Sequence, residues 1–218
     1  MGLVDDYLSY EQAKKRSSGL LYVTETVKDC LRNAYFSITD PQVFSLDTLR
    51  IFETGKMIED WYIKVLRSTT GINVILTQSP CYYKTNEIEI HGRLDALCQH
   101  NNGSLVIHEI KSIKSTIDLT EPRKEHEKQI QFYMNTLNVD FGMIDYIDKE
   151  ILINGKNRLG LGSTDKTFTV NKDPSIFANT VQRAKQLKKC VETNIPPPRE
   201  FCWRCDEFCA WKNKCNET

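Results

Sequence analysis

The spacing of apolar residues changes its period twice between positions 45 and 137. Over residues 45–67 apolar side chains recur every three or four positions, which is typical of an amphipathic helix. A helical period returns over residues 123–137. Between these helices, alternating patterns and a turn ending at Gly103 predict three strands: 72–83, 87–99 and 104–115. This order predicts helices packed against a sheet.

The rest of the chain fits the same architecture. Further strands are predicted over 142–154 and 167–170, and a further helix over 174–193. Before residue 45 we expect a short helix near residues 7–15 and another that is capped by Thr24 or Thr26. A length of 218 residues suits one domain. We therefore predict a single α/β domain over residues 1–218, with a central mixed sheet flanked by helices.

The charge balance limits how the chain can bind nucleic acid. Lys and Arg number 29, Asp and Glu also number 29, and the formal net charge is zero. Any DNA binding must therefore depend on a local basic groove. The sequence has no apolar run of about 20 residues, and no basic region followed by an apolar stretch begins it. These features predict a cytoplasmic protein that does not insert into a membrane.

Three charged residues on two predicted strands form the first candidate site. Asp95 lies on the second strand, and Glu109 and Lys111 lie two positions apart on the third, so that their side chains share one face. Two carboxylates can hold a hard divalent cation, and a lysine can orient a nucleophile or offset charge on a phosphate. The alternative is a surface Glu–Lys pair, but the apolar neighbours Val106 and Ile107 indicate a buried strand, where charges are costly unless used.

These residues and their neighbours resemble a known motif. Gly92-Arg-Leu-Asp95 followed by Val106-Ile-His-Glu109-Ile-Lys111 is similar to the PD-(D/E)XK nuclease motif in its RecB-like form. Three further segments match that family in order and spacing: Gly55–Glu59, Gln129–Tyr133 and Asp145–Lys149. The resemblance implies a restriction-endonuclease-like fold and a nuclease core over residues 45–193.

The resemblance also implies roles for individual residues. Many RecB-like nucleases carry a histidine on the first helix where this chain has Glu59, and the neighbouring Asp60 remains an alternative ligand. A carboxylate at this position is compatible with Mg²⁺ or Mn²⁺. The implied metal-binding residues are Glu59, Asp95, Glu109 and Ile110, and the implied catalytic residues are Asp95, Glu109, Lys111, Gln129 and Tyr133.

A DNA path is expected along the helix that follows the three strands. Gln129 and Tyr133 are four residues apart and share a helical face, where an amide and a phenol can fix a nucleotide. Lys124 and Lys128 lie beside them and can track phosphates. The alternative is a core tyrosine with a solvated amide. We expect Lys124, Lys128 and Tyr133 to bind DNA.

Cysteines are concentrated at the end of the sequence. The chain has eight, and four of them fall in its last seventeen residues: Cys202, Cys205, Cys209 and Cys215. In a reducing compartment, closely spaced cysteines usually bind metal. Two cofactors fit this pattern: a Zn²⁺ ion bound by all four, or an iron–sulfur cluster bound by three together with a distant fourth.

Cys30 is the candidate for that distant ligand. The segment Lys28-Asp-Cys30-Leu-Arg-Asn-Ala-Tyr-Phe resembles the first cysteine segment of the iron–sulfur RecB-like nucleases. That resemblance implies a [4Fe–4S] cluster held between regions 1–40 and 195–218. The alternative for Cys30 is a small buried apolar side chain. The favoured ligands are Cys30, Cys202, Cys205 and Cys215, with Cys209 as a substitute for Cys202 or Cys205.

Together these segments resemble the CRISPR-associated RecB-like exonucleases, the Cas four family, and related phage and archaeal exonucleases. The resemblance implies cleavage of single-stranded DNA from an end, in the 5′ to 3′ direction, and work alongside CRISPR integrase proteins. The alternative is a DNA-binding module without catalytic activity, stabilised by zinc or by a cluster. The residues themselves favour hydrolysis, because no acid and no lysine of the motif is missing.

Overall fold

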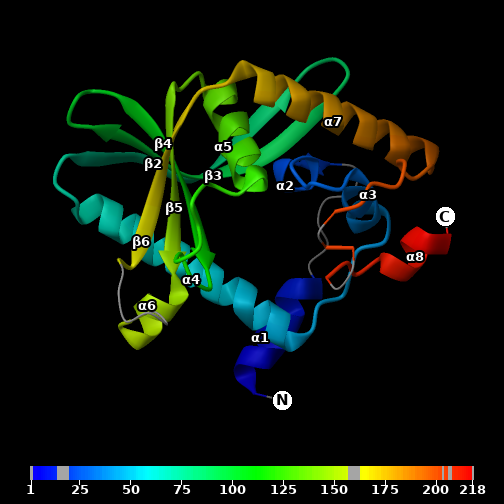
Figure 1. Cartoon of the computed structure of the whole chain (residues 1–218), viewed down its shortest axis with the longest axis horizontal. Coiled ribbons are helices and arrows are strands. Elements are labelled where there is room, and N and C mark those ends of the chain that lie inside the picture. Colours follow the sequence, from blue (N-terminus) through cyan, green and yellow to red (C-terminus); the bar gives the residue numbers. More distant parts are fainter. Residues whose placement is uncertain (1, 14–19, 157–162, 203, 206–207, 218) are drawn as a thin grey trace.

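The computed structural model describes the chain except for residues 1, 14–19, 157–162, 203, 206–207 and 218. A mixed β-sheet carries helices on both of its faces (Figure 1). The helices of the described part are α1 (Leu3–Ala13), α2 (Val23–Thr26), α3 (Leu31–Thr39), α4 (Leu46–Ser68), α5 (Lys124–Leu137), α6 (Lys149–Asn154), α7 (Pro174–Thr193) and α8 (Lys212–Glu217). The strands are β1 (Leu21–Tyr22), β2 (Ile72–Lys84), β3 (Glu89–His100), β4 (Leu105–Ile113), β5 (Phe141–Asp148) and β6 (Asp165–Asn171).

The strands follow the order β1-β3-β4-β5-β6, and β2 pairs with β3 outside that path. β2, β3 and β4 form an antiparallel meander, whereas β4 and β5 run parallel and are connected through α5. The predicted turn between β3 and β4 is confirmed: the His100 N–H donates to the Ser104 carbonyl at 3.0 Å, and Gly103 has a φ of 82°. Such a positive φ suits glycine, which lacks a Cβ.

The sheet opens in the middle of β3. β2 pairs along the length of one edge of β3, so β1 and β4 must both use the other edge. β4 pairs there with residues 96–99, and β1 pairs with residues 90–91. Beyond His108, β4 leaves β3 and continues alongside β5. Residues 92–95 therefore border an opening between β3 and β4 into which side chains can project.

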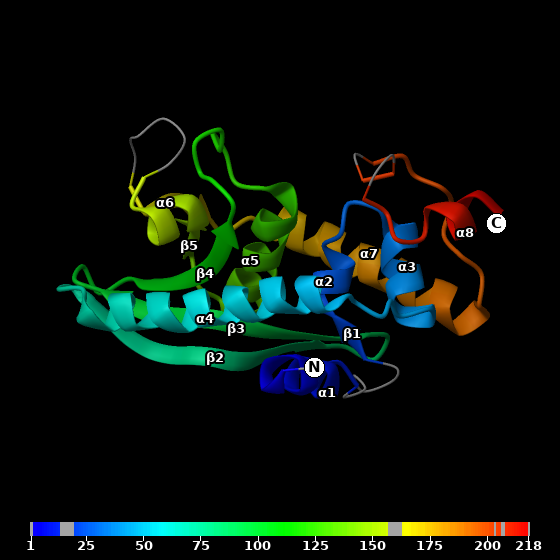
Figure 2. The ribbon, with the colours of Figure 1, turned by 90° about the horizontal axis from the view of Figure 1, so that it is seen from below.

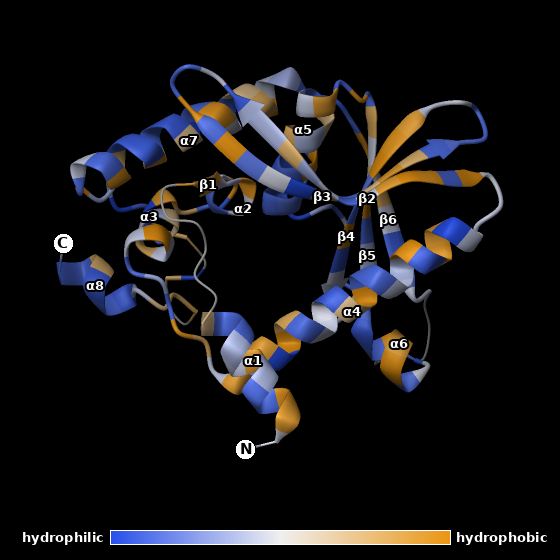
Figure 3. Ribbon diagram, turned by 180° about the vertical axis from the view of Figure 1, so that it is seen from behind, coloured by the Kyte–Doolittle hydropathy of each residue, from blue (hydrophilic) through white to orange (hydrophobic). Residues whose placement is uncertain are grey.

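Each face of the sheet has its own apolar core. On one face, Ile58, Tyr62, Ile63 and Leu66 of α4 pack on β3, β4 and β5. On the other, α2, α3, α5 and α7 bury a larger set of side chains, with Tyr133 and Tyr146 among the largest. Figure 3 shows hydrophobic and hydrophilic segments alternating along α4, as expected for a helix with one face on a sheet and one in water. Within the described part of the chain, no helix is long and apolar enough to cross a membrane.

The cysteine-rich tail lies beside α3 (Figures 1 and 2). The Trp211 indole N–H donates to the carbonyl of Asp40 at 3.1 Å, and Lys214 pairs with the Asp40 carboxylate at 2.7 Å. Near the start of α3, the Arg32 guanidinium donates to the carbonyl of Pro197 at 3.0 Å. Segments 30–40 and 197–215 are therefore in direct contact.

Two local expectations were wrong. Residues 149–154 form α6 rather than the end of a strand, because the Asp148 carboxylate accepts the Ile151 N–H at 3.0 Å and caps a helix. The helix expected after Thr24 or Thr26 is divided into α2 and α3, and Cys30 itself caps α3, with its sulfur accepting the Asn33 N–H. Neither threonine is the cap.

Asp148 joins β5, α6 and the segment after β4. Its buried carboxylate accepts the Thr116 N–H at 2.7 Å, the Ile151 N–H and the hydroxyls of Ser115 and Thr116. Burial raises the pKa of this carboxyl, but these hydrogen bonds outweigh burial and hold the pKa below its usual range. A lowered folded pKa contributes stability above the unfolded pKa of about 3.9, and that contribution is lost as the pH falls through the folded pKa.

We predict that Asp148→Ala lowers the free energy of unfolding by about 3 kcal/mol at pH 7, since it leaves two buried N–H groups without an acceptor. The difference from the parent should shrink below about pH 4. Urea unfolding across pH 3–7 measures both effects. The exposed Asp47→Ala serves as the control, with an expected change within about 0.5 kcal/mol. A pH-independent difference for Asp148→Ala would contradict the assignment.

Candidate active site

Asp95 lies at the opening between β3 and β4. It is buried, and its Oδ2 accepts the Ile110 N–H at 2.7 Å. The Asp95 side chain thus satisfies a main-chain group at the point where β4 departs from β3. Burial raises the pKa of Asp95, and the nearby Lys111 ammonium opposes that rise. The contact orients both the carboxylate and the main chain of Ile110.

Glu109 and Lys111 project from β4 into the same opening. Glu109 is completely buried, and its Oε1 lies 2.5 Å from the Lys111 Nζ. Among the described residues, the other carboxylate oxygen, Oε2, has no hydrogen-bond partner. Burial, followed by repulsion from Asp95, raises the pKa of Glu109 to about 8 despite the attraction of Lys111. A buried carboxylate oxygen without a partner is costly, and a cation would remove that cost.

Glu59, on α4, reaches the same group of charged side chains. Glu59, Asp95, Glu109 and Lys111 together form the acidic cluster. Its Oε1 lies 3.3 Å from the Gln78 amide nitrogen and 3.6 Å from the Arg93 guanidinium. Burial, followed by repulsion from Asp95, raises the pKa of Glu59. The adjacent Asp60 is exposed and interacts with Gln78 alone among the described residues. Of the two acids that the sequence left open, the structure therefore brings Glu59 to the cluster.

The charges of the cluster are unbalanced. Burial lowers the pKa of Lys111, but Glu109, Asp95 and Glu59 outweigh burial and raise it, so the ammonium stays charged. The Lys111 ammonium and, at the edge, the half-exposed Arg93 guanidinium face three carboxyl groups in a largely buried space. A divalent cation would offset negative charge there, and oxygen donors are the ligands that Mg²⁺ and Mn²⁺ prefer.

The donor set thus suits a hard cation, although the arrangement is not a finished coordination site. Among the described residues, no group of three or more His, Cys, Asp or Glu side chains is arranged to hold a metal ion. The Lys111 ammonium occupies the position next to Glu109 that a cation would share. Repulsion from Asp95 nevertheless raises the pKa of both Glu59 and Glu109, so the three carboxyl groups lie in one neighbourhood.

Gln129 and Tyr133 cover the opening from α5. Both are buried, and the Gln129 amide donates to the Tyr133 hydroxyl at 3.2 Å. Burial, followed by the negative charge of Glu109, raises the pKa of Tyr133, so the hydroxyl keeps its proton. The ring packs on Gly92, where an added Cβ would lie 2.6 Å from a ring carbon. This contact explains why the first position of Gly92-Arg-Leu-Asp95 requires a residue without a side chain.

The two lysines expected on the DNA path lie on another side of α5. Lys124 and Lys128 line a pocket of about 220 Å³ between α5 and α7, together with Arg183. Lys128 also pairs with Asp29 at 3.5 Å. They are therefore not part of the acidic cluster, and the structure does not place them beside Glu109.

Several candidate cysteines gather near the start of α3. The sulfurs of Cys202 and Cys205 lie 3.7 Å apart, and those of Cys30 and Cys205 each lie 3.9 Å from the Glu200 carbonyl. Cys209 contacts the Asn33 amide at 3.8 Å. Cys215, on α8, packs against the apolar core. Burial raises the pKa of Cys202 to about 11, so that metal binding would have to displace its proton.

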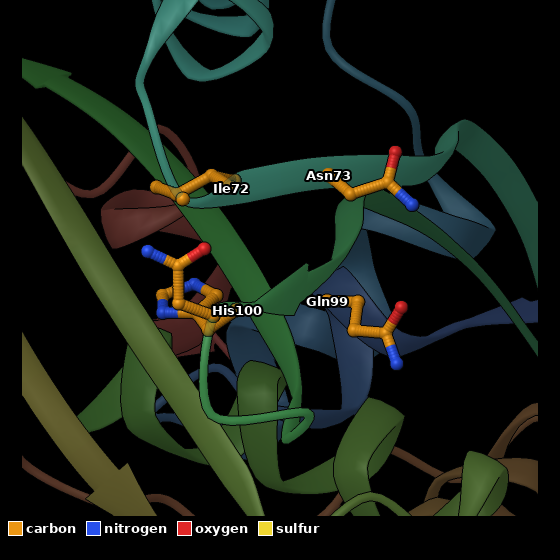
Figure 4. A pocket seen from close by; sticks show the side chains of 6 residues that line it. Ile72, Asn73, Gln99 and His100 are labelled. Carbon is orange, nitrogen blue, oxygen red and sulfur yellow. The ribbon is translucent and has the colours of Figure 1, made fainter.

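A buried chain of polar side chains, which was not predicted from the sequence, lies next to the acidic cluster. The His108 Nδ1 lies 2.7 Å from Asp145, the Thr167 hydroxyl donates to Asp145 at 2.6 Å, and the Nε2 atoms of His108 and His100 are 3.1 Å apart. His100 borders a pocket of about 290 Å³ lined by Asn73, Gln99 and other residues (Figure 4). Asp95 is five positions away along β3, or about 16 Å, so this pocket is separate from the cluster. His108, directly after the apolar residues Val106 and Ile107, was the available signal.

Comparison with known proteins defines the fold. No family model matches the chain, and no curated protein matches it. The crystal structure of SSO0001 is similar, with a TM-score of 0.67 and 19% identity over 99% of this chain and 94% of that chain. The alkaline exonuclease LHK-Exo from Laribacter hongkongensis is similar with a TM-score of 0.56 and 14% identity, over 87% of this chain and 94% of that chain. LHK-Exo in complex with dAMP gives 0.58 and 16%, over 82% and 90%. These likenesses confirm the predicted α/β fold, a restriction-endonuclease-like mixed sheet flanked by helices.

The charge imbalance predicts a stability effect in the metal-free protein. The folded pKa of Glu109, about 8, exceeds the unfolded value of about 4.3. The stability associated with its protonated form is present below the unfolded value and is lost as the pH rises through the folded pKa. Metal-free Glu109→Gln, which cannot ionise, should therefore melt at a higher temperature than the parent, by a margin that grows from pH 5 to pH 8.

Scanning calorimetry in EDTA at several pH values measures this margin. Glu121→Gln, at an exposed loop position, is the matched control and should follow the parent at every pH. If Glu109→Gln melts at or below the parental temperature at pH 8, the buried carboxylate is compensated in the folded state and the cluster needs no cation.

Proposed function

We propose that this chain is a divalent-metal-dependent nuclease that hydrolyses phosphodiester bonds of DNA at single-stranded ends. The observation that carries the proposal is the completely buried Glu109, whose Oε2 lacks a partner among the described residues and whose neighbours are Asp95, Glu59 and Lys111. A buried carboxylate with an oxygen that lacks a partner is suited to binding a cation. The fold shared with LHK-Exo, an alkaline exonuclease, supports the same reading.

The roles of the residues follow from their positions. Glu59, Asp95, Glu109 and the main chain of Ile110 would hold Mg²⁺ or Mn²⁺, and Lys111 would be released from Glu109 to face the scissile phosphate. When bound, such an ion polarises a phosphate oxygen and lowers the pKa of a coordinated water. The charged Lys111 offsets negative charge that develops on the phosphate, and the buried surroundings strengthen that interaction.

DNA would approach from the α5 side of the cluster. The Tyr133 hydroxyl keeps its proton and lies near Glu109, and Gln129 holds it in place, so both can contact the nucleotide at the cleavage point. Lys124 and Lys128 lie nearer the start of α5 and line a pocket between α5 and α7. They would contact phosphates beyond that nucleotide. LHK-Exo has been crystallised with dAMP, which supports nucleotide binding on this fold.

The finer features rest on the family resemblance. These are the preference for single strands, the 5′ to 3′ direction and work alongside CRISPR integrase proteins; the proposed cytoplasmic location rests instead on the composition of the sequence. The resemblance is to the Cas four family and to phage and archaeal exonucleases, and it rests on the motifs around Glu59, Asp95, Glu109 and Tyr133 together with Cys30 and the cysteine tail.

We further propose that Cys30 and cysteines of the tail bind a [4Fe–4S] cluster. The support is that Cys30 and Glu200, 170 positions apart, come together: the Cys30 sulfur lies 3.9 Å from the Glu200 carbonyl, and the Cys205 sulfur lies at the same distance from that carbonyl. Cys202 is adjacent to Cys205, and Cys209 lies near Asn33 at the start of α3. The favoured ligands are Cys30, Cys202, Cys205 and Cys215, with Cys209 as a substitute for Cys202 or Cys205. A cluster here would join the two ends of the fold as a long cross-link does.

Three substitutions in the acidic cluster, at Asp95, Glu109 and Lys111, should abolish cleavage. We predict that Asp95→Asn, Glu109→Gln and Lys111→Met each lower the rate of Mn²⁺-dependent digestion of labelled single-stranded DNA by roughly 100-fold or more, because each removes a contact to the cation or the phosphate. Circular dichroism establishes that the variants are folded.

The matched controls keep the same chemical changes at exposed positions: Lys64→Met on α4 and Glu121→Gln in a loop should cleave as the parent does. Parental rates for Glu109→Gln, or digestion that persists in excess EDTA, would mean that the chain binds DNA without cutting it.

The identity of the cofactor can be read from one cysteine variant. With a [4Fe–4S] cluster, protein purified without oxygen is brown with equal amounts of iron and sulfide, and Cys30→Ser loses colour and melts at a lower temperature. Cys81→Ser, at a buried cysteine remote from the tail sequence, should keep its colour.

Zinc bound by Cys202, Cys205, Cys209 and Cys215 gives the opposite result. The protein is then colourless with one zinc per chain, and Cys30→Ser keeps its zinc. Elemental analysis of parent and variant decides between the two cofactors.

A further inference from the structure

The backbone of Gln78 adopts a conformation that is unusual within a strand. Its φ is 46°, in the left-handed region, although it lies within β2. In the described part of the chain the other non-glycine residues with positive φ are Asn138 and Asn194, and both end helices, where this conformation is common. A long side chain in this region is strained. Glycine would adopt the same φ without strain, so the side chain needs a separate explanation.

The register of the sheet brings Gln78 to the acidic cluster. Thr77 pairs with Ala96 and Ser79 with Leu94, so Gln78 lies beside the part of β3 that carries Asp95. The Gln78 amide nitrogen then reaches α4, where it donates to the Glu59 Oε1 at 3.3 Å and to Asp60 at 2.7 Å.

The side chains that contact the Glu59 carboxylate approach only one of its two oxygens among the described residues. Gln78 and Arg93 both approach Oε1, whereas Oε2 has no hydrogen-bond partner among the described residues. An amide NH₂ group has two donors and no charge. It can therefore hold one oxygen of Glu59 without competing for a cation, and it can engage the neighbouring Asp60 at the same time. Arg93, which is about half exposed, is more loosely held at 3.6 Å.

We infer that Gln78 is a positioning residue for the cation site: it holds Glu59 toward Asp95 and Glu109 and keeps Asp60 outside. This inference rests on the proposed function, since Glu59 is the metal ligand there. Residues that hydrogen-bond to metal ligands fix the ligand geometry, and their loss typically weakens metal binding by about 10- to 100-fold.

The test compares Gln78→Ala with Gln78→Gly. Both remove the amide, so both should weaken Mn²⁺ binding about tenfold, measured by the electron paramagnetic resonance signal of free Mn²⁺ in titrations of the whole protein. They differ in the backbone, because only glycine is relaxed at this φ. In EDTA the Gly variant should therefore melt about 2–4 °C above the Ala variant, the reverse of the order usual in a strand.

Asn138→Gly is the matched control, since it makes the same relaxation at an exposed position with a similar φ of 54°. It should bind Mn²⁺ as the parent does. In Glu59→Gln protein, adding Gln78→Ala should cause no further loss of Mn²⁺ affinity, because the two residues act through one contact.

The outcomes separate this inference from the proposed function. If the parent binds no Mn²⁺, or Glu59→Gln binds it as the parent does, the metal site itself is wrong and the inference fails with it. If the parent binds Mn²⁺ through Glu59 but Gln78→Ala binds it equally well, only the role of Gln78 is overturned. Parental affinity in Gln78→Gly beside weak binding in Gln78→Ala would assign the effect to the backbone, which also overturns it.

Discussion

The buried carboxyl groups of Asp95 and Glu109 and the half-buried Glu59 face the Lys111 ammonium in the opening between β3 and β4, with Arg93 at its edge, and the rest of the architecture serves that arrangement. Burial and mutual repulsion raise the pKa values of Glu59, Asp95 and Glu109, while the same carboxyl groups keep Lys111 charged. A folded chain tolerates such an imbalance only at a cost in stability. That cost is consistent with a site built for a cation and a phosphate, because both would enter a space whose charges are already oriented.

The opening depends on features on both faces of the sheet. β4 departs from β3 after His108, the Asp95 carboxylate satisfies the Ile110 N–H left at that point, and α4 and α5 close the space with Glu59 and Tyr133. The cysteine tail contacts α5. Arg204 pairs with Glu125 at 2.8 Å near the start of that helix, and Glu125 also accepts the Asp29 N–H beside Cys30. The tail and the acidic cluster are thus connected through one helix.

Local patterns in the sequence predicted much of this. The two-residue spacing of Glu109 and Lys111 was sufficient to place both in one space, and the period changes gave the strands β2, β3 and β4. The helix at 149–154 was missed because a single cap, Asp148, decides it against an apolar pattern that also suits a strand. The role of Gln78 could not be predicted from the sequence. It depends on a φ value and on the register of β2 against β3, and neither composition nor periodicity predicts these.

The most direct measurement of the central claim is the position of a bound ion. Anomalous diffraction from crystals soaked in Mn²⁺ locates the metal without assumptions about activity. We expect one strong peak between Glu59, Asp95 and Glu109, about 2.2 Å from oxygens of at least two of them, with Lys111 moved off Glu109. A Mn²⁺ peak only elsewhere, or Lys111 still paired with Glu109 at saturating Mn²⁺, would contradict it.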